Sequence, residues 1–492
     1  MKSPYRAPRT MSTQHPDNVH TPFFCEQEII AGEAEIREAF YAYSHLGCLE
    51  QMWDFEGKEV DSSVVEKLLS RYHSYFSQHV LGQDIFLTMR VPNPSVERHM
   101  GKVLLETLES IPRNFDIAKG AGFDSPPIWE IILPMTTSAH ELLRIRSYYE
   151  RIVVGKSSTP IADTTVREWI GDFAPDHISI IPLIENKESL LNSKQIVSQY
   201  ISSAKPECQR VFLARSDPAL NYGAASAVLL AKIALFELGG LQSETSVEIL
   251  PIIGVGGAPF RGNLKPNNVP NCGGEYPSVQ TFTLQSSFKY DYPEKEVREA
   301  VEMLNSSARA LPLEIDRAAA LPIIEKLTNA YQSDVASLAP LIQRLSKHVP
   351  QRRKRKLHIG LFGYSRSLAG ISLPRAIPFC ASLYSIGVPP EFFGLEALTE
   401  KELDLLRSMY VHFDEDMADS AKFANPQNFE KLPNGIGGKM KKVFNSLSLP
   451  PKPENGEYSE LSLNMLASAL SDNTHALSED MAKAATIRNF LG

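Results

Sequence analysis

The chain is poor in cysteine and has no paired cysteine motif. Its 492 residues include five cysteines, an odd number that is widely scattered and contains no CxxC pair. This usage favours reduced thiols in a cytosolic protein over a disulfide-stapled secreted one. A chain of this length can hold two or three domains, or one large barrel with additions, and no internal repeat is visible.

Long apolar runs and an excess of positive charge are also missing. No uninterrupted apolar run reaches the roughly 18 residues that a membrane helix needs, and residues 1–6 lead into no signal-type apolar core. The formal net charge of -8 argues against general nucleic-acid binding, so an anion site has to be built from local arginines. For the same reason we interpret the basic run 352–356 as a solvated face. The composition, 43% hydrophobic and 22% charged, is otherwise that of an ordinary soluble globular protein.

The sequence does contain a regular series of short apolar runs, each followed by polar residues. The runs that predict β-strands are 84–89, 129–134, 177–184, 210–214, 248–253, 279–284 and 357–363. The segment that enters His15 could form an eighth strand, although its composition is poor for one. Near-continuous apolar runs of this length are typical of strands that are buried on both faces of a parallel sheet.

The segments between these runs are long enough for crossover helices, and 224–238 is rich in Ala and Leu. Eight strands with intervening helices predict a (β/α)8 barrel, in which polar residues at the C-terminal strand ends build the active site. A doubly wound open sheet uses the same strand ends and stays the alternative. We expect one catalytic barrel domain over 1–492, with a helical insertion at 292–350 before the last strand and packed helices at 389–492.

Two carboxylates, Glu185 and Asp217, each follow the end of an apolar run. Adjacent barrel strands would place them side by side over the same cavity. Hard oxygen ligands in that arrangement suit Mg²⁺ or Mn²⁺, which keep water ligands and use one or two carboxylates plus substrate oxygens. The alternative is that the two acids cap helices or pair with Arg215.

Four arginines near strand ends or on polar loops are candidate anion clamps: Arg90, Arg261, Arg366 and Arg375. A guanidinium fork suits phosphate and carboxylate because two parallel N–H donors meet two oxygens. For any single arginine the alternative is a surface position or a structural ion pair. Taken together, the four favour an anionic substrate.

The glycine-rich loop 254–263 surrounds one of these arginines, Arg261. Backbone N–H groups in such a loop, those of Gly256 and Gly257 included, can bind an anion. The loop is not a P-loop, because no GK[ST] follows, and it lacks the dinucleotide-binding spacing. The alternative is an ordinary turn.

His15 lies between a polar run and a proline near the N-terminus. Imidazole titrates near neutral pH, so a general base or a proton shuttle is one interpretation. The alternative is a histidine that caps a helix.

Several long segments carry a resemblance to a known family. They are MSTQHPDN from Met11, FLTMRVPNP from Phe86, ILPMTTS from Ile132, FLARSDPALNYG from Phe212, GVGGAPFRGNLKPNN from Gly254, TFTLQSSFKYDYP from Thr281, GLFGYSRSLAG from Gly360 and the LPRAIPFCASLYSIG that follows. In these segments, which extend in order along nearly the whole length, the chain resembles phosphoenolpyruvate carboxylase of the short, archaeal type. So many long matches in order exclude a chance resemblance.

The resemblance implies a TIM-type barrel of the phosphoenolpyruvate/pyruvate kind with additional, mainly C-terminal helices. It also implies a carboxy-lyase that converts phosphoenolpyruvate and bicarbonate into oxaloacetate and phosphate, through carboxyphosphate and a metal-stabilised enolate. Mg²⁺ or Mn²⁺, a homotetramer and a cytoplasmic location belong to the same expectation, without nucleic-acid or membrane partners. The alternatives are another lyase or phosphotransferase on this barrel, or a non-catalytic metabolite-binding protein.

The resemblance assigns roles residue by residue. His15 matches the histidine of the TAHP segment in the longer bacterial and plant enzymes, which implies a catalytic role. Glu185 and Asp217 match their metal-binding glutamate and aspartate. Arg90 matches a phosphate-side arginine, and Arg261 matches the second arginine of their glycine-rich loop, which implies substrate binding and catalysis.

The remaining comparisons with the longer enzymes give two further matches and also show where this chain departs from them. Arg366 and Arg375 match two further active-site arginines, the first with a catalytic role. Val255 stands where the longer enzymes have the first arginine of the loop, and Leu220 where they have a lysine. The tail at 488–492 loosely resembles their C-terminal RNTG, which makes Asn489 a candidate for an inhibitor site.

Overall fold

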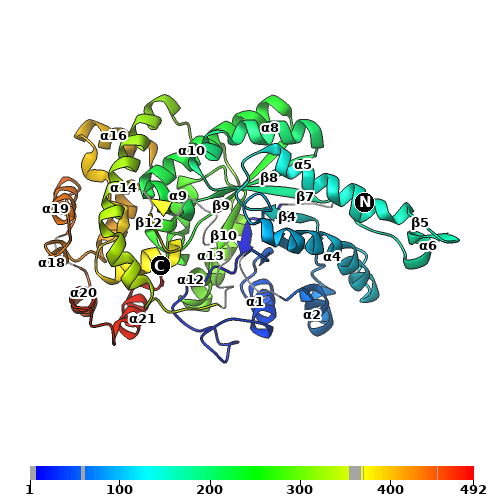
Figure 1. Ribbon diagram of the computed structural model, residues 1–492, viewed down its shortest axis with the longest axis horizontal. Helices are drawn as coiled ribbons and strands as arrows, with labels where there is room; N and C mark the ends of the chain where they lie inside the picture. Colours follow the sequence, from blue (N-terminus) through cyan, green and yellow to red (C-terminus); the bar gives the residue numbers. More distant parts are fainter. Residues whose placement is uncertain (1–6, 57–60, 354–366, 369–370, 451–452) are drawn as a thin grey trace.

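The computed structural model describes residues 7–56, 61–353, 367–368, 371–450 and 453–492. Within them, eight parallel strands close into a barrel that is surrounded by helices (Figure 1). In order around the barrel the strands are β1 (Thr10–Ser12), β2 (Glu50–Asp54), β3 (Phe86–Arg90), β4 (Glu130–Leu133), β7 (Ser179–Ile184), β8 (Cys208–Ala214), β9 (Glu248–Gly254) and β10 (Thr281–Leu284). The closed parallel arrangement confirms the predicted (β/α)8 barrel and excludes the open doubly wound sheet.

Most barrel strands lie where the apolar runs predicted them. Six of the seven runs contain a barrel strand, and the segment that enters His15 is β1. The strand that the pattern missed is β2, and the last predicted run, 357–363, lies outside the described residues. The expected position of the helical region 292–350 was wrong, because its helices follow β10, the last strand of the closed barrel.

Polar side chains fill the N-terminal end of the barrel interior. The Arg210 guanidinium on β8 donates to Glu50 on β2 at 2.7 and 2.8 Å and to Glu130 on β4 at 2.8 Å. It also donates to the Thr281 hydroxyl on β10 at 3.0 Å. These side chains come from alternate strands and form one layer, as in other barrels of this type. An apolar layer covers them on the C-terminal side, and includes Met52, Ile132, Phe212 and Ile252.

Helices cover the outside of the barrel (Figure 1). The longer ones between strands are α1 (Glu33–Ser44), α2 (Val64–Arg71), α4 (Gly101–Gly120), α5 (Ala139–Tyr148), α8 (Ser193–Ala204) and α10 (Ala224–Thr245). The shorter ones are α3 (His73–Phe76), α6 (Val166–Ile170), α7 (Lys187–Leu191), α9 (Ser216–Tyr222), α11 (Val269–Glu275) and α12 (Ser286–Tyr290).

One of these helices, α10, confirms the predicted crossover helix and corrects another expectation. It is rich in Ala and Leu, which have high helix propensity. By length and composition alone it could cross a membrane, although no uninterrupted apolar run of that length was recognised. The structure buries 78% of its most apolar window inside the protein, so α10 is a core helix.

The C-terminal part is helical, as predicted. After β10 follow α13 (Glu294–Ser306), α14 (Arg317–Ser346), α15 (Ala376–Ser385), α16 (Glu400–Met409), α17 (Phe413–Ala421), α18 (Pro426–Phe429), α19 (Ile436–Ser446), α20 (Gly456–Leu470) and α21 (Leu477–Arg488). These helices gather on one side of the barrel (Figure 1). Phe379 of α15 packs on Phe260 in the loop after β9, with ring centroids 5.6 Å apart, so the barrel and the C-terminal helices share one core.

A small arm projects from the opposite side (Figure 1). It consists of the antiparallel strands β5 (Pro160–Ile161) and β6 (Thr164–Thr165), followed by α6. None of the side chains of α6 is buried, and Trp169 is 69% exposed. This arm therefore lacks a hydrophobic core of its own. An isolated two-stranded hairpin is marginally stable in water.

Replacing Arg210 by Ala should destabilise the barrel strongly. The change leaves the buried carboxylates of Glu50 and Glu130 without their cation, which typically costs about 3–5 kcal/mol. Urea unfolding followed by circular dichroism measures the loss. Lys295→Ala serves as the control, because Lys295 and Glu299 form an exposed pair with side chains 85% and 64% accessible. Equal midpoints for the two variants would contradict the structural role of the Arg210 layer.

Candidate active site

A cavity of ≈ 410 Å³ opens at the C-terminal end of the barrel. The predicted site residues that line it are His15, Arg90, Glu185, Asp217, Arg261 and Arg375. Arg90 is the last residue of β3, the others follow β1, β7, β8 and β9, and Arg375 precedes α15. Because all barrel strands are parallel, their C-terminal ends meet at one face, and residues far apart in sequence converge there. Arg366 lies outside the described residues.

Glu185 and Asp217 form the acidic part of the cavity. They follow neighbouring strands, since β7 pairs with β8 through Ile184 and Leu213. The Glu185 carboxylate accepts a hydrogen bond from the backbone N–H of Met135 at 2.7 Å. Burial raises the pKa of Glu185 to about 8, and the charge of Asp217 adds to this effect.

This acidic pair fits a divalent cation. Among the described residues no group of three or more His, Cys, Asp or Glu side chains meets to hold a metal. Two carboxylates beside an open cavity are the donor set that Mg²⁺ and Mn²⁺ use when water and substrate oxygens complete the coordination. A cation between Glu185 and Asp217 would also relieve the repulsion that raises the pKa of Glu185.

Arg90 is held by acids at the end of β2. Its Nε and Nη2 donate to the two oxygens of Asp54, each at 2.7 Å, and Nη2 lies 3.2 Å from Glu56. The bidentate contact fixes the plane of the guanidinium. Arg90 and Glu56 both line the cavity.

Arg375 lies opposite a buried acid that no sequence pattern indicated. Among the described residues, its buried Nε has no hydrogen-bond partner. Glu97, which is 2% exposed, likewise has no hydrogen-bond partner at either carboxylate oxygen within that part of the chain. Burial raises the pKa of Glu97 to about 7, as does Glu56, whereas the positive charge of Arg375 lowers it. Arg375 therefore has donor capacity that a ligand in the cavity could use.

Arg261 is deeply buried and mostly occupied by contacts inside the protein. Its Nη1 donates to Asp17 at 3.2 Å and to the Gly492 carbonyl at 2.7 Å. Its Nε donates to the Ser216 hydroxyl at 3.2 Å, and its Nη2 to Gln285. At 1% exposure it offers one remaining Nη2 hydrogen to a ligand.

Gly256 and Gly257 support this arginine and are absent from the cavity lining. The Gly256 N–H donates to the Arg261 carbonyl at 2.9 Å, and the Gly257 N–H to Asp17 at 3.5 Å. A Cβ at Gly256 would come within 2.9 Å of the Arg261 guanidinium carbon. The two glycines therefore allow the loop to close tightly on Arg261, and direct contact between them and a substrate stays a prediction.

His15 follows β1 and lines the cavity. Its Nδ1 shares a hydrogen bond of 2.9 Å with the Thr13 hydroxyl. Its carbonyl accepts from the N–H of Ser286 at 3.2 Å. The ring is therefore oriented through Nδ1, which directs the other ring nitrogen away from Thr13.

The basic run was misinterpreted as a solvated face. Arg352 and Arg353 are 6% and 3% exposed and line the cavity, while the rest of the run lies outside the described residues. Arg352 donates to Glu28 at 2.9 Å, and Arg353 donates to the buried carboxylate of Glu38. Glu38 is fully buried, whereas the Glu28 side chain is 77% exposed and Arg352 also donates from Nε to the buried Asn18 carbonyl at 3.3 Å. Such partners, which only the tertiary structure supplies, reverse the usual preference of a charge run for water.

Asn489 does not line the cavity. It ends α21 in a left-handed conformation, with φ 59°, and only Leu491 of the tail contacts the cavity. The inhibitor site at Asn489 stays a prediction.

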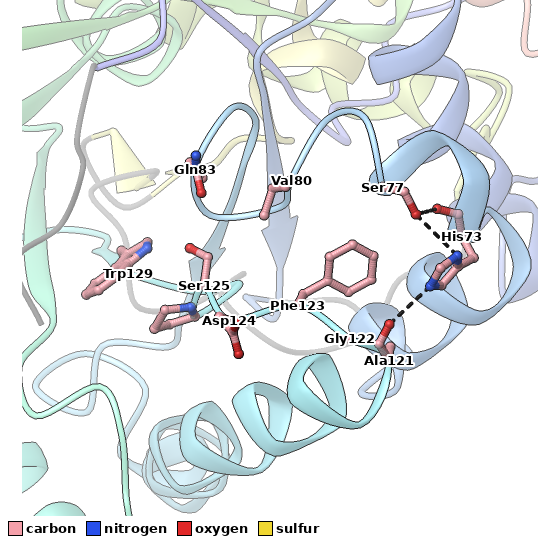
Figure 2. A pocket seen from close by; sticks show the side chains of 11 residues that line it. His73, Ser77, Val80, Gln83, Ala121, Gly122, Phe123, Asp124, Ser125 and Trp129 are labelled. Atoms are coloured by element: carbon pink, nitrogen blue, oxygen red, sulfur yellow. Dashed lines mark hydrogen bonds between the residues drawn. The ribbon is translucent and has the colours of Figure 1, made fainter.

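A second hollow, of ≈ 560 Å³, lies between α3 and the segments that enter β3 and β4 (Figure 2). The His73 side chain lines this hollow, and its Nε2 lies 3.0 Å from the Ala121 carbonyl oxygen. The lining has one carboxylate, Asp124, and neither arginine nor lysine. Its place at the N-terminal end of the strands and its lack of converging charges make it a poor candidate for chemistry.

The chain is similar to known proteins along nearly its whole length. A family model described as phosphoenolpyruvate carboxylase matches residues 7–492. The chain is 49% identical to the phosphoenolpyruvate carboxylase of Methanothermobacter thermautotrophicus, over 99% of this chain and 100% of that protein. It is 55% identical to the protein of the same name from Pyrococcus abyssi, over 86% of this chain and 90% of that one. Among solved structures, a citrate lyase from Burkholderia xenovorans covers 77% of this chain and 99% of its own at 13% identity, with a TM-score of 0.36, too distant to bear on function.

Binding of Mn²⁺ to the acidic pair should release protons. Without a cation, Glu185 holds a proton below a pKa of about 8, and proton and cation compete for the same oxygens. Affinity should therefore weaken as pH falls below that value, by up to about tenfold per pH unit for one competing proton. Calorimetric titration in buffers of different ionisation enthalpy measures both quantities.

Two variants check the assignment of the ligands. Asp217→Asn removes one ligand and the repulsion on Glu185, so both the affinity and the proton release should fall. Glu188→Gln changes an exposed acid nearby and should bind Mn²⁺ like the unmodified protein. Unchanged affinity in Asp217→Asn would rule out the pair as the cation site.

Proposed function

The chain belongs to the phosphoenolpyruvate carboxylase family, and we propose that the cavity at the C-terminal end of its barrel is where it carboxylates phosphoenolpyruvate. The reaction joins phosphoenolpyruvate and bicarbonate and yields oxaloacetate and phosphate, and the family requires a divalent cation. The observation that carries the location is the convergence of His15, Glu185 and Asp217 with six arginines on one cavity, among them the predicted Arg90, Arg261 and Arg375. We take the whole chain as one catalytic unit.

The cation, Mg²⁺ or Mn²⁺, is held by Glu185 and Asp217 in this proposal. When bound, it supplies a Lewis acid that stabilises negative charge on the enolate oxygen. The protein's part is to hold both carboxylates at the ends of adjacent strands. The hydrogen bond from the Met135 N–H to Glu185 supports the ionised form of that carboxylate.

The arginines bind and neutralise the phosphate and carboxylate groups of the substrates. Arg90, Arg375 and Arg261 line the cavity, and Arg261 has one Nη2 hydrogen that its protein contacts leave over. Charge neutralisation and alignment are the main requirements of phosphoryl transfer, here from phosphoenolpyruvate to bicarbonate, which gives carboxyphosphate and the enolate of pyruvate. Arg366 is assigned to the same group by resemblance alone.

His15 acts as the base in this scheme. It takes the proton of the carboxyl group of carboxyphosphate, which then separates into carbon dioxide and phosphate beside the enolate. The enolate C3 forms the new carbon–carbon bond with carbon dioxide. Water has to be excluded at this stage, because protonation of C3 gives pyruvate instead; the loop around Arg261 is the segment that we assign to closure.

The exposed arm supports a homotetramer. Trp169 and Ile170 are 69% and 59% exposed on a hairpin that has no buried side chain of its own. Large apolar residues in that setting are typical of surfaces that a partner covers. We therefore assign the arm to a contact between subunits, and we place the protein in the cytoplasm, where its free cysteines stay reduced.

His15→Asn should stop the formation of oxaloacetate, because no base remains to take the carboxyphosphate proton. Loss of a general base typically costs about 10²–10⁴-fold in rate. Bicarbonate-dependent release of phosphate and pyruvate should continue. Coupled assays with malate dehydrogenase and lactate dehydrogenase measure the two products. His140→Asn, an exposed histidine on α5, is the control, and a fully active His15→Asn would remove His15 from the mechanism.

Omitting bicarbonate separates the carboxylase from other enzymes of this barrel type. A lyase or phosphotransferase that uses the same substrate would turn over without it, and a non-catalytic binding protein would not turn over at all. Only the carboxylase loses turnover when bicarbonate is removed and regains it when bicarbonate returns.

Trp169→Ser should shift the protein from tetramers to smaller species, because it removes the largest apolar side chain of the arm. Light scattering after size-exclusion chromatography measures the mass. Leu311→Ser alters another exposed apolar residue, 84% accessible, outside the arm, and should leave the mass unchanged. A tetramer that survives Trp169→Ser would remove the arm from the subunit contact.

A further inference from the structure

The segment that carries His15 is held by a buried lysine from another part of the chain. Lys289, on α12, donates from Nζ to the Ser12 hydroxyl, to the Thr13 carbonyl and to Glu38, each at 3.0 Å. The side chains of Lys289 and Glu38 are both 0% exposed. An ammonium group has three hydrogens, so every donor of Lys289 is used on β1, on the residue that follows it, and on one counter-ion.

These contacts act on the imidazole through Thr13. The Thr13 hydroxyl lies 2.9 Å from His15 Nδ1, while the carbonyl of the same residue accepts from Lys289. The His15 carbonyl accepts from the N–H of Ser286, the first residue of α12. One short helix therefore holds the backbone on both sides of Gln14 and, through the Thr13 hydroxyl, the ring itself.

The counter-ion of Lys289 belongs to a buried network of charged side chains that converges on one oxygen of Glu38, Oε1. Glu38 also accepts from Arg353 and from the Tyr290 hydroxyl, the latter at 2.8 Å. Arg353 lines the cavity and lies 3.4 Å from Glu35. Two cations, Lys289 and Arg353, thus face two buried carboxylates. Such a network is rigid because each group has lost its water and depends on the others.

A further link joins the network to the arginine side of the cavity. The Gln14 side chain donates from Nε2 to the Glu35 carboxylate at 3.4 Å. Its Oε1 accepts from the backbone N–H of Asp54 at 3.1 Å. Asp54 is the residue that holds Arg90. The residue between Thr13 and His15 therefore connects the base to the acid that orients a substrate-binding arginine.

We propose that Lys289 is a positioning residue for His15, a role that rests on the proposed function of His15 as the base. Lys289 does not line the cavity and touches no substrate. It sets the height and rotation of the imidazole over the enolate, so that the proton leaves carboxyphosphate before water reaches C3. Its effect is on which product forms, more than on how fast phosphate is released.

The competing reaction needs only water in addition to the two substrates. When His15 is misplaced, the enolate C3 takes a proton and becomes pyruvate. Carboxyphosphate adds water at phosphorus and returns to bicarbonate and phosphate. The net change is hydrolysis of phosphoenolpyruvate to pyruvate and phosphate, with bicarbonate still required for the first step.

The test compares two buried lysines that each pair with a glutamate. Lys289→Met removes the three hydrogen bonds at β1. Lys232→Met removes the ammonium of α10 that lies 2.5 Å from Glu275, with side chains 3% and 4% exposed, and has no contact with Thr13 among those of the described residues. A general loss of stability should be common to both, whereas a change in product ratio should belong to Lys289 alone.

The readout is the ratio of pyruvate to oxaloacetate per phosphate released, at saturating substrates and cation. Misplacement of a reacting group by about 1 Å can cost 10²-fold, so we expect the ratio to rise by at least about tenfold in Lys289→Met. Lys232→Met should keep the ratio of the unmodified protein. Lys289→Arg, which keeps the charge, should restore part of the oxaloacetate.

A ratio in Lys289→Met equal to that of the unmodified protein overturns the inference, and so does an equal rise in Lys232→Met. If Lys289→Met does not fold, Thr13→Val decides, because it removes only the hydroxyl beside His15 Nδ1; an unchanged ratio there is equally contrary. His15→Asn separates the two levels. If His15→Asn still forms oxaloacetate, His15 is not the base. If His15→Asn forms none while Lys289→Met and Thr13→Val keep the normal product ratio, His15 stays the base and only the positioning role of Lys289 is rejected.

Discussion

Closure of the barrel by β1 is the contact on which the rest of the structure depends. This strand has three residues, and it pairs with β10 on one side and with β2 on the other. Without it the sheet would have two open edges, and edge strands expose unpaired backbone groups. Closure also brings the segment that leads to His15 to the same face as Glu185 and Asp217, which arrive from the far side of the barrel.

Charge is handled differently at the two ends of the barrel interior. At the N-terminal end, Arg210 meets Glu50 and Glu130 directly, so that layer is neutralised by contacts within the protein and packs as part of the core. At the C-terminal end, Glu185 and Asp217 line the open cavity, and burial together with the charge of Asp217 raises the pKa of Glu185, although the positive charge of Arg90 acts in the opposite direction. An imbalance of this kind is characteristic of sites that are completed by a ligand or a cation.

The features that sequence patterns missed are polar groups with buried partners. The strand β2 begins with Glu50 and Gln51, which do not belong to an apolar run, yet both are fully buried because Glu50 faces Arg210 inside the barrel. Arg353 was misinterpreted for the same reason, because it is buried against Glu38. Hydropathy assigns such residues to water, and only a partner that is distant in sequence makes their burial favourable.

The sequence alone determined the fold class, the positions of most strands and the candidate site residues, six of which meet at one cavity. It could do so because short apolar runs with polar ends are a local property of the chain, and because long ordered motifs resemble one family. The tertiary structure decided which strands close the barrel, which charges neutralise one another and which stay open to the cavity. Those outcomes depend on distances between residues such as Lys289 and Thr13, hundreds of positions apart, which no local pattern contains. Burial then converts each such contact from a weak surface attraction into a determinant of position.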